Sequence, residues 1–370
     1  MGRETGRVRL KPEWIMKKIL VASTVLISVA LLAGCSSTGG VAAVGGGGAG
    51  AGGALPLTGK GTMLAFRAPA TVSVNQGFLI TELTSANSTD RTNPDGVTIE
   101  ASATEDKAVA PVVTPPEHKI VNGLFDAKVT GTLEGGTQFA EIKQAKGRVY
   151  FEGGNFGDPQ INTENASISA VGVYNIFNQT GQLVDKIVMK EGTTLRYRGG
   201  VAGGNVADFG VGFIGNNTTA MPGAGTAQYK GFLEGATSVY ETATGLNQMG
   251  LSGDVALAAN FQTGKVTGGV SNGALLTFDN QSNTLVNLNS NITGLSVNAD
   301  ITGSEYAGSA TLVDAAGNAV GTTRTNDVIG AFFGDGAAET AAAVQIEGTA
   351  MLEGRSSDYI LTGVIGGVKK

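Results

Sequence analysis

Short segments in which apolar and polar residues alternate, separated by Gly or Asn, fill the chain from about residue 226 onward. They include "LSGDVALAANF", "GKVTGGV", "GALLTFDN" and "NDVIGAFFG". In the first of these, Val255, Leu257 and Ala259 fall on one face, as in a half-buried β-strand. Eight or nine such strands joined by tight turns predict a small antiparallel up-and-down β-barrel over residues 226–370.

Residues 55–225 are more polar and less regular, and they predict a separate β-rich domain of short strands and long loops. Strand-like pieces lie at Gly147–Gly154 and Ala166–Asn178, and Leu183–Gly200 has the pattern of hairpin strands. No amphipathic helix of ten or more residues stands out. The predicted fold class is therefore all-β, with an N-terminal β-rich domain followed by the barrel.

The closely spaced glycines of "GAFFGDGAAETAAAV" could belong to a phosphate-binding turn or to a strand of the barrel wall. Alternation places Phe332 and Phe333 on opposite faces of a strand, with Gly330 and Gly334 permitting the bend of a small barrel. No helix N-terminus follows to hold a phosphate. The stretch is therefore interpreted as barrel wall, in which a buried Glu339 would need backbone or Arg partners.

Composition agrees with a folded β protein. Gly makes up 58 of 370 residues and Pro only 9, while 41% of the residues are hydrophobic, which is too many for a disordered chain. A chain of this length can bury two cores of ordinary size. The glycines are therefore expected in turns, bulges and tight strand crossings.

The N-terminus predicts a lipoprotein signal peptide over residues 1–34. From Met16, two lysines precede an apolar run from Ile19 to Leu32, and "LAGC" ends at Cys35, the only cysteine. The run is short for a transmembrane helix. Cys35 is the predicted lipid anchor, and a plain secretory peptide is the alternative. Translation starts either at Met16 or at residue 1 with a long basic segment.

Residues 35–54 form a Gly-rich, uncharged stretch that predicts a flexible tether between the lipid and the domains. Without residues 1–34 the chain keeps 19 basic and 29 acidic residues, a net charge of about −10. Such an acidic surface repels phosphate backbones, so nucleic acid is not an expected partner. A membrane-spanning barrel is disfavoured by short strands and by the absence of aromatic girdles.

The side chains that catalysis needs are scarce. His118 is the only histidine, there is no G-x-S-x-G motif, and zinc is not expected with one His and one Cys. No enzyme activity, catalytic residue, metal or required cofactor is predicted. His118 is expected on a solvated loop or strand edge, and the alternative is an axial ligand to haem carried as cargo.

Four ordered motifs carry a resemblance to a known family. They are "MPGAGTAQYKG", "GDVALAANFQTGKVTGGV", "GAFFGDGAAETAAAV" and "LTGVIGGVKK". Together they resemble the transferrin-binding-protein-B-like surface lipoproteins, well over residues 205–370 and weakly over 55–200. The matching residues are Met221, Pro222, Gly225, Tyr229, Gly231, Asp254, Phe261, Gly264, Gly268, Gly330, Phe332, Gly334, Glu339, Gly363 and Gly366.

The resemblance implies a handle domain at 55–225 and an eight-stranded barrel at 226–370, displayed as a monomer on a Gram-negative outer membrane. Such proteins hold a cargo, namely an iron-carrier protein, haem or another solute, commonly for a TonB-dependent receptor. Two alternatives stay open. One is a protein-binding, immune-evasion module of the factor-H-binding type, and the other is a structural envelope lipoprotein without a dedicated ligand.

Overall fold

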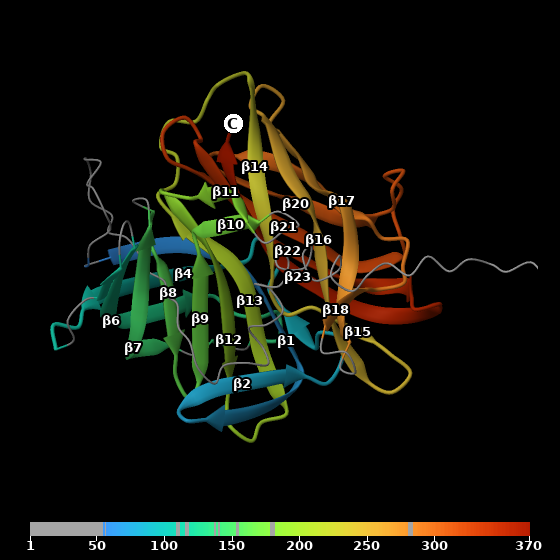
Figure 1. The fold of residues 1–370 in the computed structure, drawn as a ribbon, viewed down its shortest axis with the longest axis horizontal. Coiled ribbons are helices and arrows are strands. Elements are labelled where there is room, and N and C mark those ends of the chain that lie inside the picture. Colours follow the sequence, from blue (N-terminus) through green and yellow to red (C-terminus); the bar gives the residue numbers. More distant parts are fainter. Residues whose placement is uncertain are drawn as a thin grey trace, which may run out of the picture.

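The computed structural model describes residues 55, 57–108, 112–114, 118–136, 138–139, 141–152, 155–177, 182–279 and 284–370. Every regular element in these ranges is a β-strand, which confirms the predicted all-β class. The predicted signal peptide, Cys35 and the tether lie outside the described residues. Figure 1 shows two strand assemblies that follow each other along the chain.

The first assembly, called the first barrel, is a closed ring of eight antiparallel strands. It closes where the last strand returns to the first, with pairs from Gly61↔Ile214 to Pro69↔Val206. Around the ring the strands are β1 (Leu57–Asn75), β4 (Val97–Glu105), β6 (His118–Thr130), β7 (Ile142–Glu152), β8 (Asp158–Asn162), β9 (Ala166–Val171), β12 (Gly192–Gly200) and β13 (Val206–Gly215).

Five short strands lie outside this ring: β2 (Phe78–Leu83), β3 (Asp90–Arg91), β5 (Val112–Thr114), β10 (Val173–Phe177) and β11 (Leu183–Val188). β10 and β11 form a separate two-stranded hairpin, whereas β12 pairs with β9 and β13. The prediction that Leu183–Gly200 forms a hairpin was therefore wrong, because its two strands belong to different sheets.

The second assembly, called the second barrel, confirms the predicted eight-stranded up-and-down barrel. Successive strands are neighbours, and β14 pairs with β23 to close the ring. Its strands are β14 (Thr226–Gly235), β16 (Leu246–Asn260), β17 (Lys265–Asp279), β19 (Gly294–Thr302), β20 (Glu305–Val313), β21 (Thr322–Phe333), β22 (Glu339–Leu352) and β23 (Arg355–Lys369), and β15 (Val239–Glu241) and β18 (Thr284–Asn287) are short additions.

Phe332 and Phe333 lie on opposite faces of β21, as the alternation predicts. Phe332 is buried inside the second barrel, where its ring packs against those of Tyr229, Phe261 and Tyr306. Phe333 is equally buried on the outer face, in a cluster that also contains Phe213 of the first barrel. The stretch is therefore wall, with one aromatic ring filling the core and the next filling the contact between barrels.

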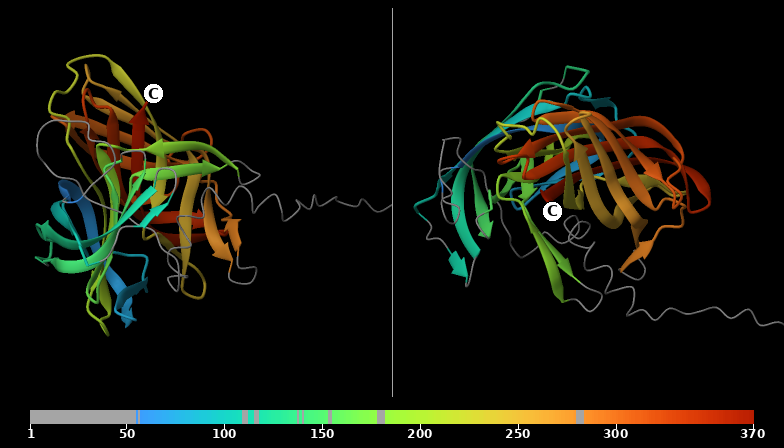
Figure 2. Two further views of the ribbon diagram at one scale, coloured as in Figure 1. Left: turned by 60° about the vertical axis from the view of Figure 1, so that its left-hand side comes forward. Right: turned by 90° about the horizontal axis from the view of Figure 1, so that it is seen from above.

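The two barrels pack side by side through their walls, as Figure 2 shows. β22 and β23 are buried along almost their whole length, because their inner faces fill the second barrel and their outer faces meet the first. β13 is buried on both faces in the same way. Strands buried on both faces lose the alternating pattern, which explains why the sequence did not predict closure of the first barrel.

Candidate functional site

The wall of the second barrel is open between β14 and β16. These strands pair from Thr226↔Asn260 to Gly231↔Val255 and then separate. Beyond that point β14 pairs only with β23, and β16 pairs only with β17, through a register shift between Ser252 and Asp254. The wall closes again at β15, where Val239 pairs with Gln248. A β-bulge bends its strand and interrupts the ladder, so the bulge accounts for the separation.

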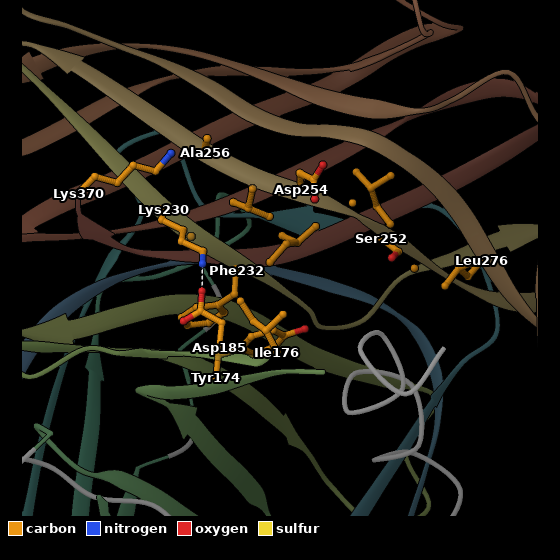
Figure 3. A pocket seen from close by; sticks show the side chains of 16 residues that line it. Tyr174, Ile176, Asp185, Lys230, Phe232, Ser252, Asp254, Ala256, Leu276 and Lys370 are labelled. Carbon is orange, nitrogen blue, oxygen red and sulfur yellow. Dashed lines mark hydrogen bonds and ion pairs between the residues drawn. The ribbon is translucent and has the colours of Figure 1, made fainter. Parts of the chain in front are cut away.

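A cavity of about 570 Å³, called the lateral cavity, occupies this opening. Its walls are Gly231–Leu233 of β14 and Gly250–Ala256 of β16, and the β10–β11 hairpin covers it from outside with Tyr174, Ile176 and Asp185. Figure 3 shows the hairpin residues on one side and Ser252, Asp254 and Ala256 on the other. The cavity therefore lies between a strand opening in one barrel and a hairpin that belongs to the preceding part of the chain.

Two contacts hold the hairpin over the opening. The rings of Tyr174 and Phe232 stack with centroids 4.8 Å apart and an angle of 4°. Beside them Lys230 of β14 forms an ion pair with Asp185 of β11, in which both side chains are 42% exposed (Figure 3). An exposed pair of this kind contributes little to stability, so the aromatic stack is the stronger attachment.

The lateral cavity offers a mixed surface. Leu233, Leu251, Val255 and Leu276 supply apolar area, and Lys230, Lys370, Asp185 and Asp254 supply charge of both signs. Asp254 accepts a hydrogen bond from the Asn272 amide at 3.1 Å. Burial, and then the nearby Glu234 carboxylate, raise the pKa of Tyr174 to about 12, so its phenol is neutral at physiological pH. The surface suits an amphipathic ligand.

Two of the predicted family residues, Gly231 and Asp254, line this cavity. Gly363 and Gly366 lie close by on β23, where an added Cβ at Gly363 would come within 2.9 Å of Leu233. Tyr229 instead points into the core and donates a hydrogen bond from its hydroxyl to the Ala337 carbonyl at 2.8 Å. Only a few of the motif residues therefore lie at the opening, and Tyr229 serves packing.

The remaining predicted residues are structural. Phe261 packs on Phe332, Met221 packs against the barrel core, and the Gly225 carbonyl accepts a hydrogen bond from the Phe261 amide at 2.9 Å. Pro222 is half-buried just before β14, Gly264 and Gly334 occupy turns with φ of +65° and +70°, Gly268 lies in β17, and Gly330 lies against the Tyr306 ring.

His118 is the first residue of β6, where its backbone pairs with Thr114 and Glu152. The described residues contain no group of three or more His, Cys, Asp or Glu that could hold a metal ion. In the same ranges no helix is long and apolar enough to cross a membrane.

Glu339 lies at the contact between the barrels rather than in the cavity. Its buried carboxylate accepts hydrogen bonds from the backbone amides of Lys190, Glu191 and Gly192, at 2.6, 3.0 and 3.2 Å. Burial raises the pKa of Glu339 to about 7, although the three amides oppose the shift. The carboxylate thus links the second barrel to the segment that joins β11 to β12.

A buried ion pair also connects the barrels. The Arg196 guanidinium on β12 contacts the Glu234 carboxylate on β14 at 2.8 Å, with side chains only 14% and 6% exposed. Burial raises the pKa of Glu234 and the Arg196 charge lowers it. Together with the Glu339 contacts, this pair fixes β14 and the lateral opening relative to the first barrel.

The hairpin residues of the cavity were missed by the sequence analysis. Tyr174 and Ile176 alternate in "VYNIF", which indicates one apolar face on β10, but nothing in the sequence shows that this face covers a different barrel.

Comparison with known proteins finds a family match for the second barrel. Residues 221–369 match the model described as the C-lobe and N-lobe β barrels of Tf-binding protein B. No curated protein matches the chain.

Two of the similar solved structures are transferrin-binding protein B. A single-substitution variant from Haemophilus parasuis Hp5 is 14% identical, with 86% of this chain and 77% of that chain covered and a TM-score of 0.35. The isotype 1 protein from serogroup B Neisseria meningitidis is 11% identical, with 85% and 77% covered and a TM-score of 0.25. The assignment rests on the family model: the second barrel of this chain belongs to the family of the transferrin-binding protein B β barrels.

Proposed function

We propose that this chain is a surface lipoprotein of a Gram-negative outer membrane that binds a small amphipathic solute and presents it to an uptake system. The main support for this proposal is the lateral cavity. Its volume of about 570 Å³ lies within the usual range of small-ligand sites, and its walls combine aromatic and aliphatic area with a few charges. The predicted lipid anchor at Cys35 and the glycine tether support display at a membrane surface.

The position of the cavity supports a holding role. One wall is barrel and the other is a two-stranded hairpin, attached mainly by the Tyr174–Phe232 stack. A solute could enter or leave by displacement of the hairpin, without opening either closed ring. In this proposal the handle domain at 55–225 and the barrel at 226–370 cooperate at one site. Their boundary remains a prediction, as does a TonB-dependent receptor as the recipient.

Native mass spectrometry of the full-length protein, extracted from its own membranes in mild detergent, tests the proposal. A bound small molecule that dissociates on collisional activation is expected, since cavities of this size hold drug-sized ligands. Haem as the solute would also give a visible absorption band. Protein that is homogeneous and ligand-free from cells grown in several media would contradict a solute-binding function.

A second candidate cargo is an iron-carrier protein, because the matched family takes its name from Tf-binding protein B. Interferometry with immobilised full-length chain and iron-loaded or iron-free transferrin tests it. Saturable binding of either form, unaffected by a substitution that fills the lateral cavity, would assign protein cargo to another surface. Absence of binding at micromolar transferrin would remove this candidate.

A further inference from the structure

A second pocket, of about 210 Å³, lies between the barrels and shares no lining residue with the lateral cavity. We call it the junction pocket. The first barrel and its β2 strand contribute one side and the β14–β15–β16 region of the second barrel contributes the other. Its lining residues are Thr81, Glu82, Leu83, Arg198, Phe209, Gly235, Ala236, Thr237, Ser238, Val239, Leu246, Asn247, Gln248 and Met249.

Arg198 is the unusual member of this lining. It projects from β12 on the same face as Arg196, but Arg196 is already paired with Glu234. The Arg198 side chain has no ion pair or hydrogen bond with any residue that the structure describes, and the charge that acts on it is Arg196, which repels it. Burial, and then that repulsion, lower the pKa of Arg198 to about 10, so the guanidinium stays charged at neutral pH.

Arg198 is half-buried, and a charge without a partner in such a place is unfavourable, because it has lost part of its hydration and gained no protein contact in exchange. Glu82 is the only carboxylate in the lining; it is exposed and makes no ion pair with Arg198. The Arg198 guanidinium is therefore available to bind an anion. A guanidinium matches a planar carboxylate particularly well, because two parallel N–H groups can donate to its two oxygens.

Thr81 supplies a second polar group without a partner. The residue is 6% exposed, and its side-chain oxygen is buried and makes no hydrogen bond within the described part of the chain. A buried hydroxyl left unsatisfied costs free energy comparable to a lost hydrogen bond. Thr81 and Arg198 come from different strands, β2 and β12, yet line the same small pocket. An oxyanion that reaches both groups would remove both costs.

The pocket also has an apolar part beside the polar side chains of Thr237, Ser238, Asn247 and Gln248. It is formed by Leu83, Phe209, Val239, Leu246 and Met249, most of which belong to or pack against a buried cluster between the barrels. Apolar walls favour a ligand with a hydrocarbon body and disfavour a fully hydrated inorganic ion. The small volume limits that body to a short chain or a single ring.

We propose that the junction pocket binds a small monocarboxylate whose carboxylate accepts hydrogen bonds from Arg198 and Thr81 and whose apolar body lies among Leu83, Phe209 and Met249. The ligand contacts both barrels at once and so stabilises their association. The site is independent of the cargo proposed for the lateral cavity, because the two have no residue in common.

Isothermal titration of the full-length protein in detergent tests this proposal with three probes: hexanoate, the neutral hexanamide and inorganic phosphate. Hexanoate is expected to bind one to one, and hexanamide and phosphate at least tenfold more weakly. Arg198→Met should weaken hexanoate binding at least tenfold and Thr81→Val about fivefold, in line with the loss of a charged and a neutral hydrogen bond. Glu82→Gln should bind equally or more tightly.

Matched controls separate binding from folding. The exposed Arg355 offers a comparable substitution away from the pocket, so Arg355→Met should bind hexanoate like the wild type. The empty Arg198→Met protein should melt no lower than the wild type, because it loses an unpaired charge. Three results would overturn the proposal: no hexanoate binding, equal binding of hexanamide, or phosphate binding in preference to hexanoate.

Discussion

The ring of Phe333 on β21 meets the ring of Phe213 on β13 edge-on, with centroids 5.9 Å apart and an interplanar angle of 66°. Phe333 also fills the space above Gly192 and Gly215, where an added Cβ would come within 2.6 Å of its ring. The second barrel thus places an aromatic ring where two glycines of the first barrel leave space. This complementarity defines how the barrels fit together.

Gly192→Ala should therefore destabilise the protein by about 1–3 kcal/mol, since overpacking forces the Phe333 ring or the backbone to move. Calorimetry would record a lower melting temperature. Gly223→Ala is the matched control, because nothing lies within 4 Å of a Cβ at Gly223 and it should leave the melting temperature unchanged. Equal melting temperatures for both variants would show that Phe333 does not constrain the interface.

The free energy of unfolding should fall as pH rises from about 4.5 to about 7, because the buried Glu339 carboxyl group loses its proton. Its pKa is about 7 in the folded protein against an ordinary value of 4.5, so the folded state holds a proton that the unfolded state releases. The shift corresponds to about 3 kcal/mol lost across this window. Urea unfolding at several pH values measures the slope, and Glu339→Gln should flatten it. An unchanged slope in that variant would assign the pH dependence to other buried acids.

Removal of one partner of the Arg196–Glu234 pair should lower the free energy of unfolding far more than replacement of both partners by apolar residues. Either Arg196→Met or Glu234→Leu leaves one buried charge uncompensated, and each should lower the unfolding free energy by about 3–5 kcal/mol. The combined variant Arg196→Met/Glu234→Leu should lose much less unfolding free energy than the sum of the losses in the two single variants. Denaturant midpoints of all four proteins give the coupling, and additive losses would argue against a direct interaction.

Cys35→Ala should release the protein from membranes into the soluble fraction, because the thiol is the predicted point of lipid attachment. Fractionation followed by immunoblotting measures this, with Ser36→Ala as the control that keeps the cysteine. Membrane retention of the Cys35 variant would contradict the predicted anchor.

Local pattern predicted those features of the fold that depend on neighbouring residues. Alternation placed Phe332 and Phe333 on opposite faces, and burial of Glu339 implied backbone or Arg partners. The identity of those partners was not predictable, since Lys190 lies 149 residues earlier in the chain. A pattern of this kind specifies the period of a strand but not its distant neighbours.

The lateral cavity shows the same limit. Its opening depends on a register shift between Ser252 and Asp254 and on the position of the β10–β11 hairpin. The pattern of apolar and polar residues in β16 predicts neither feature. The sequence therefore predicted a barrel and a binding role, but not where on the barrel a ligand would lie.

Titration of the identified solute into two matched tryptophan variants distinguishes a cargo site in the lateral cavity from a site elsewhere on the protein. Ser252→Trp places an indole in the lateral cavity, whereas Ser296→Trp adds the same group on the exposed face of β19. We predict that the Ser252 variant loses at least tenfold in affinity while it keeps hexanoate binding at the junction pocket, and that the Ser296 variant binds the solute like the wild type. Equal solute affinity in both variants would contradict a cargo site in the lateral cavity.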